Sequence, residues 1–451
     1  MNQTLIKNCT LINRGERFEG ASILIEGQRI KKIFKCDDSL PSEVQIFDAT
    51  GLLCIPGVID DQVHFRDPGL THKGDLSTES LAALKGGVTS FMDMPNTLPQ
   101  TTSREAWEEK MILGKEKSWV NYSFFFGATN TNADEVTEIS SNKHVPGIKV
   151  FLGASTGNML VDNMDALRAI FSKAQGIVAI HSEDEEIIKN NKANYQEKYG
   201  EDPDVQWHPY IRSREACVSS TTKAINLAKE CHTRLHVLHL STADEIELLK
   251  QSPEHITGEV CLHHLWFDDS SYKTLGTKIK WNPAIKTIED REALRDAVRE
   301  GIIKVVATDH APHLPSEKEG GCLKAASGGP LVQHSLVMML KLARDKEWSI
   351  EKVVDTMCHG PADLFGIEGR GYLDEGAFAD IVLIDPNAPW VVSSDNIASK
   401  CGWSPMTGYQ FQDQVKHIFL NGQLALYNTQ LVEKAKGAAL PLTFMKSEVY
   451  E

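Results

Sequence analysis

Residues 57–65, GVIDDQVHF, form a short apolar segment that ends in side chains able to bind a metal or carry charge. In an extended strand successive side chains point to opposite faces, so Gln62, His64 and Arg66 share one face and Asp61 takes the other. The segment therefore predicts a buried strand that delivers an imidazole and a guanidinium into one cavity.

The same pattern recurs along the chain, with polar residues closing each apolar segment and a helical stretch following it, as at residues 77–87, 164–175 and 221–232. Alternating strands and helices are typical of a parallel sheet, and a barrel gathers the strand ends at one rim. We predict an α/β fold, a (β/α)8 TIM-type barrel. Its candidate strands are residues 57–65, 88–95, 120–128, 147–153, 176–182, 234–241, 256–264 and 303–310.

The two ends of the chain have a different pattern. Residues 1–56 and the segments GYLDEGAFADIVLIDP (371–386) and VKHIFLNGQLALYN (415–428) alternate polar and apolar residues around glycine turns. We predict a small composite β-sandwich domain formed by residues 1–56 and 367–451, beside a barrel that spans residues 57–366.

The composition excludes several classes of protein. The 451 residues are 41% hydrophobic and carry a net charge of −15, with no basic stripe for nucleic acid and no apolar run for a membrane. The nine cysteines are an odd number and form no CxxC pair, and the N-terminus resembles no secretory signal. We expect a cytoplasmic protein with reduced thiols that binds neither nucleic acid nor membrane.

Five of the strand-end side chains offer nitrogen and oxygen donors suited to zinc. A protonated lysine cannot bind a metal, but N-carboxylation would turn Lys149 into a carboxylate able to bridge two ions. Bound zinc would activate water for attack on an amide carbonyl, and Asp309 is placed to move the proton. The candidate ligands are His64, Lys149, His181, His239 and Asp309.

Simpler structural roles also fit these residues taken singly. A strand-end histidine is often a hydrogen-bonded core residue, and His236 and His263 suit such structural roles. The Lys149 side chain can extend along the barrel, and Asp309 can cap a helix. The order of the candidates on successive strands favours a site. Arg66 would leave an unpaired cation in the cavity unless an anionic substrate binds. The alternative is a salt bridge to Asp67 or Asp93.

Eight segments carry a resemblance to class I dihydroorotases of the amidohydrolase superfamily: PGVIDDQVHFRDPGLTHK, GGVTSFMDMPNT, GIKVFLG, HSED, HLST, NPAIK, ATDHAPH and GAFADIVLID. The resemblance implies the reversible cyclisation of N-carbamoyl-L-aspartate to L-dihydroorotate in de novo pyrimidine biosynthesis, by a homodimer. It implies one or two Zn²⁺ per subunit, held by the five candidates above with Lys149 carboxylated and Asp309 as the catalytic acid and base. The substrate-binding residues would be Arg66, Asn96, Asn282 and His313.

The chain departs from this family at Gln62, where the first ligand histidine is expected. A neutral carbonyl is a weaker zinc donor than imidazole, so the ion held by His64, Lys149 and Asp309 should bind less tightly. Two other functions stay open. One is a catalytically impaired partner of another pyrimidine enzyme, and the other is a hydantoinase or allantoinase. The arginine in RDPG and the MPNT segment favour dihydroorotase.

Overall fold

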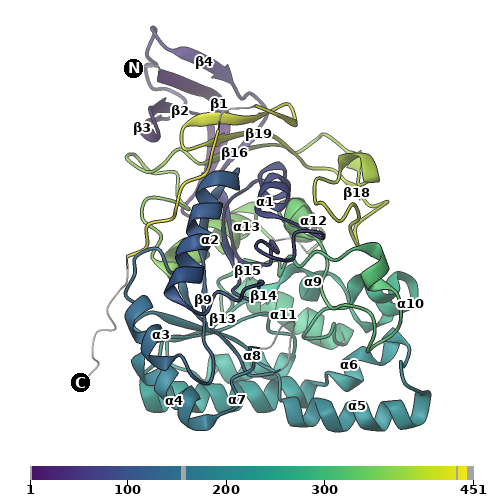
Figure 1. Ribbon diagram of the computed structural model, residues 1–451. Coiled ribbons are helices and arrows are strands. Elements are labelled where there is room, and N and C mark those ends of the chain that lie inside the picture. The colour runs from purple at the N-terminus through teal and green to yellow at the C-terminus, as the bar shows by residue number, and fades with distance from the viewer. Residues whose placement is uncertain (1–2, 154–158, 347, 433–434, 444–451) are drawn as a thin grey trace.

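The structure is a computed structural model that describes residues 3–153, 159–346, 348–432 and 435–443. Figure 1 shows helices packed around a central set of strands, and a β-rich layer at one end in which N-terminal strands lie beside the later strands β16 (Ile381–Asp385) and β19 (Gln414–Leu420). Within the described residues, the model contains no helix that is both long and apolar enough for a membrane span.

The central strands form the predicted barrel. All pairings between neighbouring barrel strands are parallel. β8 and β9 together occupy one strand position, and so do β13 and β14. A bridge from Val63 to His310 joins the first strand to the last. Eight strand positions therefore close into a ring within the described residues, as predicted. They are β6 (Val58–Val63), β7 (Val88–Asp93), β8 (Asn121–Phe124) with β9 (Phe126–Gly127), β10 (Gly147–Phe151), β11 (Ile177–His181), β12 (Leu235–Val237), β13 (Ile256–Gly258) with β14 (Val260–Cys261), and β15 (Val306–Ala307).

Helices surround the barrel strands. Several of them start after a capping residue: the Asp75 carboxylate accepts hydrogen bonds from the Ser77 and Thr78 amides at the start of the first helix. The helices are α1 (Leu76–Lys85), α2 (Arg104–Lys117), α3 (Ala133–Ile139), α4 (Met164–Lys173), α5 (Glu185–Tyr199), α6 (His208–Ile211), α7 (Arg214–Cys231), α8 (Ala243–Lys250), α9 (Leu262–Trp266), α10 (Tyr272–Leu275), α11 (Ile288–Glu300), α12 (Ser335–Asp345), α13 (Ile350–Val354) and α14 (Gly360–Phe365).

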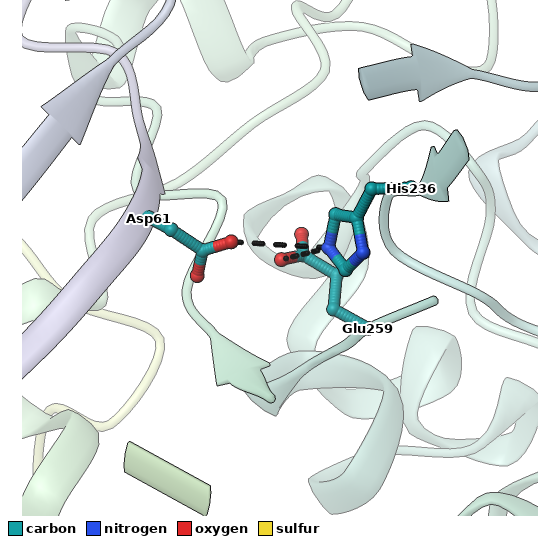
Figure 2. Close-up of side chains that lie close together, drawn as sticks. All are labelled: Asp61, His236 and Glu259. Carbon is teal, nitrogen blue, oxygen red and sulfur yellow. Dashed lines mark hydrogen bonds and ion pairs between the residues drawn. The ribbon is translucent and has the colours of Figure 1, made fainter. Parts of the chain in front are cut away.

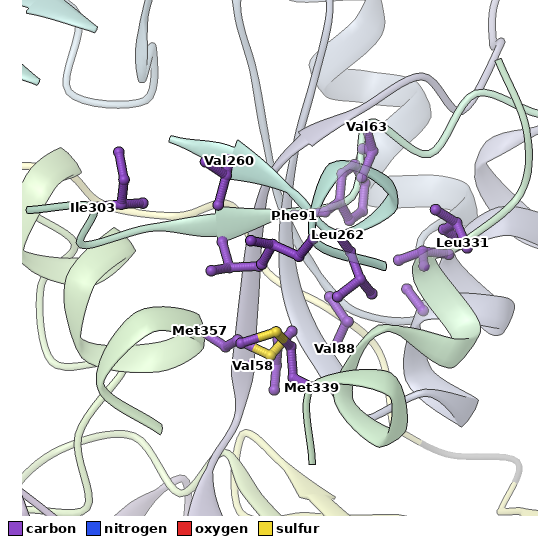
Figure 3. Close-up of a cluster of buried hydrophobic side chains, with 14 of the residues drawn as sticks. Val58, Val63, Val88, Phe91, Val260, Leu262, Ile303, Leu331, Met339 and Met357 are labelled. Carbon is purple, nitrogen blue, oxygen red and sulfur yellow. The ribbon is translucent and has the colours of Figure 1, made fainter. Parts of the chain in front are cut away.

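The main hydrophobic core lies between the strands and these helices. Figure 3 shows part of it, where Val58 of β6, Val88 of β7 and Val260 of β14 gather with Met339 of α12. All four side chains are buried. The apolar residues of the strands thus hold the barrel to its helices and fix the positions of the strand ends.

Strands from both ends of the chain share one sheet. Its nine strands, counted within the described residues, include β5 paired antiparallel with β16, which joins the N-terminal part to the C-terminal part. The boundaries of the two domains stay predictions. The strands are β1 (Gln3–Asn13), β2 (Glu16–Glu26), β3 (Arg29–Phe34), β4 (Gln45–Asp48), β5 (Leu53–Pro56), β16 (Ile381–Asp385), β19 (Gln414–Leu420), β20 (Gln423–Tyr427) and β21 (Gln430–Leu431), and a separate pair is formed by β17 (Trp390–Val391) and β18 (Gln410–Phe411).

Strand β6 contains a bulge that changes the expected direction of one side chain. Asp60 pairs with Phe91 and Val63 with Asp93, so β6 uses one residue more than β7 over this interval. The side-chain carbonyl of Gln62 contacts the Cys261 thiol of β14. The Asp61 carboxylate faces Glu259, which precedes Cys261 by two residues. Both side chains therefore point into the barrel, and the prediction that Asp61 takes the opposite face is wrong.

Candidate active site

His64 lies at the centre of the candidate site, just after β6. Its Nδ1 is 2.8 Å from Asn96 Oδ1, and its Nε2 is 3.0 Å from Asp309 Oδ1. Asn96 follows β7 and Asp309 follows β15, so the three side chains meet at the ends of three neighbouring strands. Asn96 thus orients the imidazole whose other nitrogen faces the carboxylate.

His181 and His239 form a second pair of donors. Their Nδ1 and Nε2 atoms are 3.0 Å apart, and burial lowers the pKa of both imidazoles, which keeps them in the neutral form that binds metal. Burial alone would raise the pKa of Glu183, but Arg212 and His181 lower it to about 2. This carboxylate lies 2.9 Å from His181 Nε2 and holds the ring in place.

Lys149 is buried inside the barrel, on β10. Burial lowers the pKa of its amine to about 7, against opposing effects of Asp309 and Glu259. Its Nζ lies 4.6 Å from the centre of the Phe151 ring. Near neutral pH a large fraction of this amine is unprotonated, which is the form that reacts with carbon dioxide.

The backbone is in the left-handed region at three of these positions, with φ of 70° at Arg66, 41° at His239 and 46° at Asp309. L-residues other than asparagine and aspartate adopt this conformation infrequently, and it is found often at active sites, where surrounding structure holds it. Each of the three residues follows the end of a barrel strand. The turns aim their side chains at the same rim.

Arg66 is a buried cation whose observed partners are uncharged. Its Nε donates to Pro312 O at 3.1 Å, and its terminal nitrogen lies 3.0 Å from His313 Nε2. Asp67 and Asp93, the acids considered as partners in the sequence, pair with Lys117 and Lys110 instead, at 2.8 and 2.6 Å. The salt bridge expected as the alternative for Arg66 is therefore not formed.

The surroundings of His313 are strongly cationic. Burial, then Arg66, Lys73 and Lys318, lower the pKa of this imidazole far below its usual value. The Lys318 ammonium donates to three backbone carbonyls, those of residues 280, 326 and 328. Lys73 is balanced by Glu317 at 3.0 Å, so Arg66, whose observed partners are uncharged, is the cation here that favours the binding of an anion.

These groups border a small cleft lined by His64, Arg66, Trp281, Asn282, Asp309, Ala311, Ser327 and Gly328. The Asn282 Oδ1 atom is buried and has no hydrogen-bond partner among the described residues. A buried polar atom of this kind is costly unless a ligand or water satisfies it. The structure thus brings all four predicted substrate residues to this cleft or to the side chains that line it.

Gln62 does not take part in this constellation. Its Oε1 accepts a hydrogen bond from the Cys261 thiol at 3.3 Å, deeper in the barrel. The remaining donors include two pairs at a spacing that suits zinc, because two ligands of a tetrahedral zinc lie about 3.4 Å apart and the His64–Asp309 and His181–His239 contacts are 3.0 Å. The expected set of His64, Lys149, His181, His239 and Asp309 as ligands stays a prediction.

Sequence reasoning missed a further cluster beneath these residues. Figure 2 shows Asp61 of β6, His236 of β12 and Glu259, between β13 and β14, turned toward one another. Alternation along β6 placed Asp61 on the other face, and His236 was assigned a structural role. The sequence held one indication of this cluster. Two of its members are acids in apolar strand segments, where burial of an uncompensated charge is unfavourable.

The sequence of this chain is similar to those of known proteins over most of its length. The Amidohydrolase family model matches residues 53–425. The dihydroorotase of Methanosarcina acetivorans is 31% identical over 416 residues, covering 89% of this chain and 88% of that protein. The dihydroorotase of Halobacterium salinarum is 33% identical over 390 residues, covering 86% and 89%.

Two solved structures have the same fold. The L-hydantoinase (dihydropyrimidinase) of Arthrobacter aurescens superposes with a TM-score of 0.91 at 26% identity. The match covers 98% of this chain and 100% of that protein. The dihydropyrimidinase of Brevibacillus agri NCHU1002 gives a TM-score of 0.90 at 24% identity, covering 98% and 99%. The chain therefore belongs to the amidohydrolase family, as a cyclic amidohydrolase.

Proposed function

We propose that this cyclic amidohydrolase is a dihydroorotase, which interconverts N-carbamoyl-L-aspartate and L-dihydroorotate in pyrimidine biosynthesis. The observation that carries the proposal is the buried guanidinium of Arg66 at the cleft, bonded to a carbonyl and an imidazole. Dihydroorotate carries a carboxylate beside its cyclic amide, and guanidinium binds both oxygens of such a group.

The chain's own residues provide positions for both parts of the substrate. Arg66, His313 and Asn282 lie where they can hold the carboxylate and the ring, and Asn96 keeps His64 oriented. In the hydrolytic direction Asp309 delivers a proton to the departing ring nitrogen, and in the synthetic direction it removes that proton. The residues to which we assign these roles belong to one rim of the barrel.

We also propose that the enzyme depends on one or two Zn²⁺ ions and that Lys149 is N-carboxylated. Zinc, when bound, polarises the amide carbonyl and lowers the pKa of water to about 7. The lowered pKa of Lys149, about 7, supports carboxylation because it increases the fraction of reactive amine. A homodimeric, cytoplasmic enzyme is the state expected from the family resemblance.

A hydantoinase activity is the second candidate, because the L-hydantoinase of Arthrobacter aurescens shares the fold at 26% identity. Hydantoin and dihydropyrimidines need have no carboxylate, so they would leave the Arg66 charge without a partner in the cleft. This difference favours the anionic substrate.

The proposal is tested by hydrolysis of L-dihydroorotate and of hydantoin by purified protein, with bound metal counted in the same samples. We expect turnover of dihydroorotate by metal-loaded wild type, and loss of that turnover in Asp309→Asn. Faster turnover of hydantoin would establish the second candidate instead. Metal-loaded protein that turns over neither substrate would point to a catalytically impaired partner of another pyrimidine enzyme.

A further inference from the structure

Asp61, His236 and Glu259 form a closed group of donor atoms inside the barrel, distinct from the five proposed zinc ligands at its rim. We propose that this group binds a divalent transition-metal ion, such as zinc, in a buried structural site. The inference does not depend on the substrate proposed above, because none of the three residues lines the cleft.

The distances fit a metal site. His236 Nε2 lies 3.2 Å from Glu259 Oε2 and 3.9 Å from Asp61 Oδ2, and the three ligand atoms lie within 4.8 Å of one another. Ligands bound about 2.1 Å from zinc are separated by about 3.4 Å in tetrahedral geometry. Small side-chain movements therefore bring all three atoms to one ion.

The hydrogen-bond partners of His236 direct its Nε2 toward the two acids. The Thr257 hydroxyl donates to the Leu235 carbonyl at 3.2 Å, so it is free to accept from His236 Nδ1, which lies 2.8 Å away. The Nδ1 atom then carries the proton, and Nε2 presents a lone pair to Asp61 and Glu259. This arrangement, with the second ring nitrogen fixed by a hydroxyl, is the one that metal-binding histidines have.

Each acid has at least one buried oxygen without a hydrogen-bond partner among the described residues. Both carboxylate oxygens of Asp61 and the Oε1 of Glu259 are buried without a hydrogen bond, and both side chains are 0% exposed. Two ionised carboxylates in such a place cost several kcal/mol each unless a cation balances them. One divalent ion balances both charges and satisfies the open oxygens.

The competing arrangement is a shared proton. Burial raises the pKa of Glu259 to about 8 and also raises that of Asp61, so without a metal Glu259 holds a proton at neutral pH. A protonated Glu259 then donates to His236. If the proton is shared, Asp61 binds no metal, and Asp61→Asn leaves the metal content of the protein unchanged.

The site would connect parts of the barrel that do not pair directly. Asp61 comes from β6, His236 from β12, and Glu259 from the break between β13 and β14. Among the described residues, β6 belongs to a sheet with β7 and β8, whereas β12 and β13 belong to a second sheet and β14 to a third. All three residues are buried, and a closed site of this kind stabilises a fold. We therefore expect the ion to raise thermal stability.

The experiment compares metal-loaded wild type with Asp61→Asn and Glu259→Gln, which keep shape and remove charge. Asp60→Asn is the matched control, because Asp60 is an adjacent buried acid already bonded to the Thr308 hydroxyl at 2.6 Å. Zinc per chain is counted by mass spectrometry after removal of loose metal. We expect Asp61→Asn and Glu259→Gln each to hold about one equivalent less than wild type and Asp60→Asn to hold as much as wild type.

A variant of the rim site separates the two metal positions. His181→Asn should lose metal at the rim while keeping the ion bound by the buried group. Crystals of zinc-loaded wild type, measured at the zinc absorption edge, should show an anomalous peak between Asp61, His236 and Glu259, so the proposal stays testable if a variant does not fold. Full metal content in Asp61→Asn, or no anomalous peak at this position, would overturn it in favour of the shared proton.

Discussion

The Cys261 thiol donates a hydrogen bond to the side-chain carbonyl of Gln62 at 3.3 Å, inside the barrel. Burial raises the pKa of this thiol well above its usual value, so it stays protonated and remains a donor. The contact holds the Gln62 side chain deeper in the barrel, although Gln62 occupies the sequence position at which the resemblance expects a metal-binding imidazole. The rim therefore has His64 and Asp309 as its donors on this side.

Replacement of Gln62 by histidine should strengthen metal binding at the rim. Imidazole is a better zinc donor than a neutral carbonyl, and we expect the zinc dissociation constant of this position to fall by about tenfold or more. Zinc titration of chelator-treated protein, followed by calorimetry, measures the change. Gln62→Ala, which supplies no donor, is the control and should not tighten binding. Equal affinities for Gln62→His and wild type would show that this position does not reach the metal.

Arg66→Gln should weaken dihydroorotate binding far more than binding of a neutral substrate. Loss of a charge-assisted pair costs about 1.5–3 kcal/mol, so we expect KM for dihydroorotate to rise by about 10- to 100-fold. Steady-state kinetics with dihydroorotate and hydantoin measure the difference. Arg168→Gln, at an exposed ion pair with Glu230, is the control. A similar loss for both substrates would show that Arg66 supports the structure and does not select the anion.

Recovery of activity from metal-free protein should depend on carbon dioxide. The pKa of Lys149 is lowered to about 7, so the reactive amine becomes the major form above that pH. At constant dissolved carbon dioxide, zinc should restore activity faster at pH 8 than at pH 6. Stopped assays after zinc addition measure the rate, and Lys149→Gln should show no response to carbon dioxide. A rate independent of carbon dioxide in wild type would exclude carboxylation of Lys149.

The stability of metal-free, unmodified protein should also report on Lys149. Its pKa is near 10.5 in the unfolded chain and about 7 in the folded protein, so the unfolded state binds more protons between these values. The Lys149 contribution to the free energy of unfolding therefore increases as pH rises from 7 toward 10.5. Thermal unfolding of wild type and Lys149→Met over this range, in chelator and without carbon dioxide, checks the direction. The increase with pH should be smaller in Lys149→Met.

Lys110→Met should destabilise the barrel. Lys110 of α2 pairs with Asp93 of β7 at 2.6 Å, and both side chains are 0% exposed. Removal of the cation leaves a buried carboxylate unbalanced, which costs about 3–5 kcal/mol. Denaturant unfolding measures the loss, with Lys115→Met, at an exposed position on the same helix, as the control. A loss below about 1 kcal/mol would show that Asp93 takes up a proton or finds another partner.

Much of the rim was predictable because parallel strands end at a common edge. Apolar segments closed by His64, His181 and His239 indicated both the strands and the donors, and the structure pairs His181 with His239 and His64 with Asp309. Their roles as ligands stay predictions. The bulge in β6 was not predictable, because one extra residue in a strand depends on its pairing with β7 and leaves no periodic trace in the sequence.

The sequence by itself determined the order of strands and helices, the family and the identity of the groups available for chemistry. Hydrophobic periodicity is local, and it records which faces of each element are buried. Only the tertiary structure decided which groups meet: Arg66 with His313, and Asp61 with His236 and Glu259. These contacts join residues up to 247 positions apart, and their distances depend on how the closed ring of strands places each side chain.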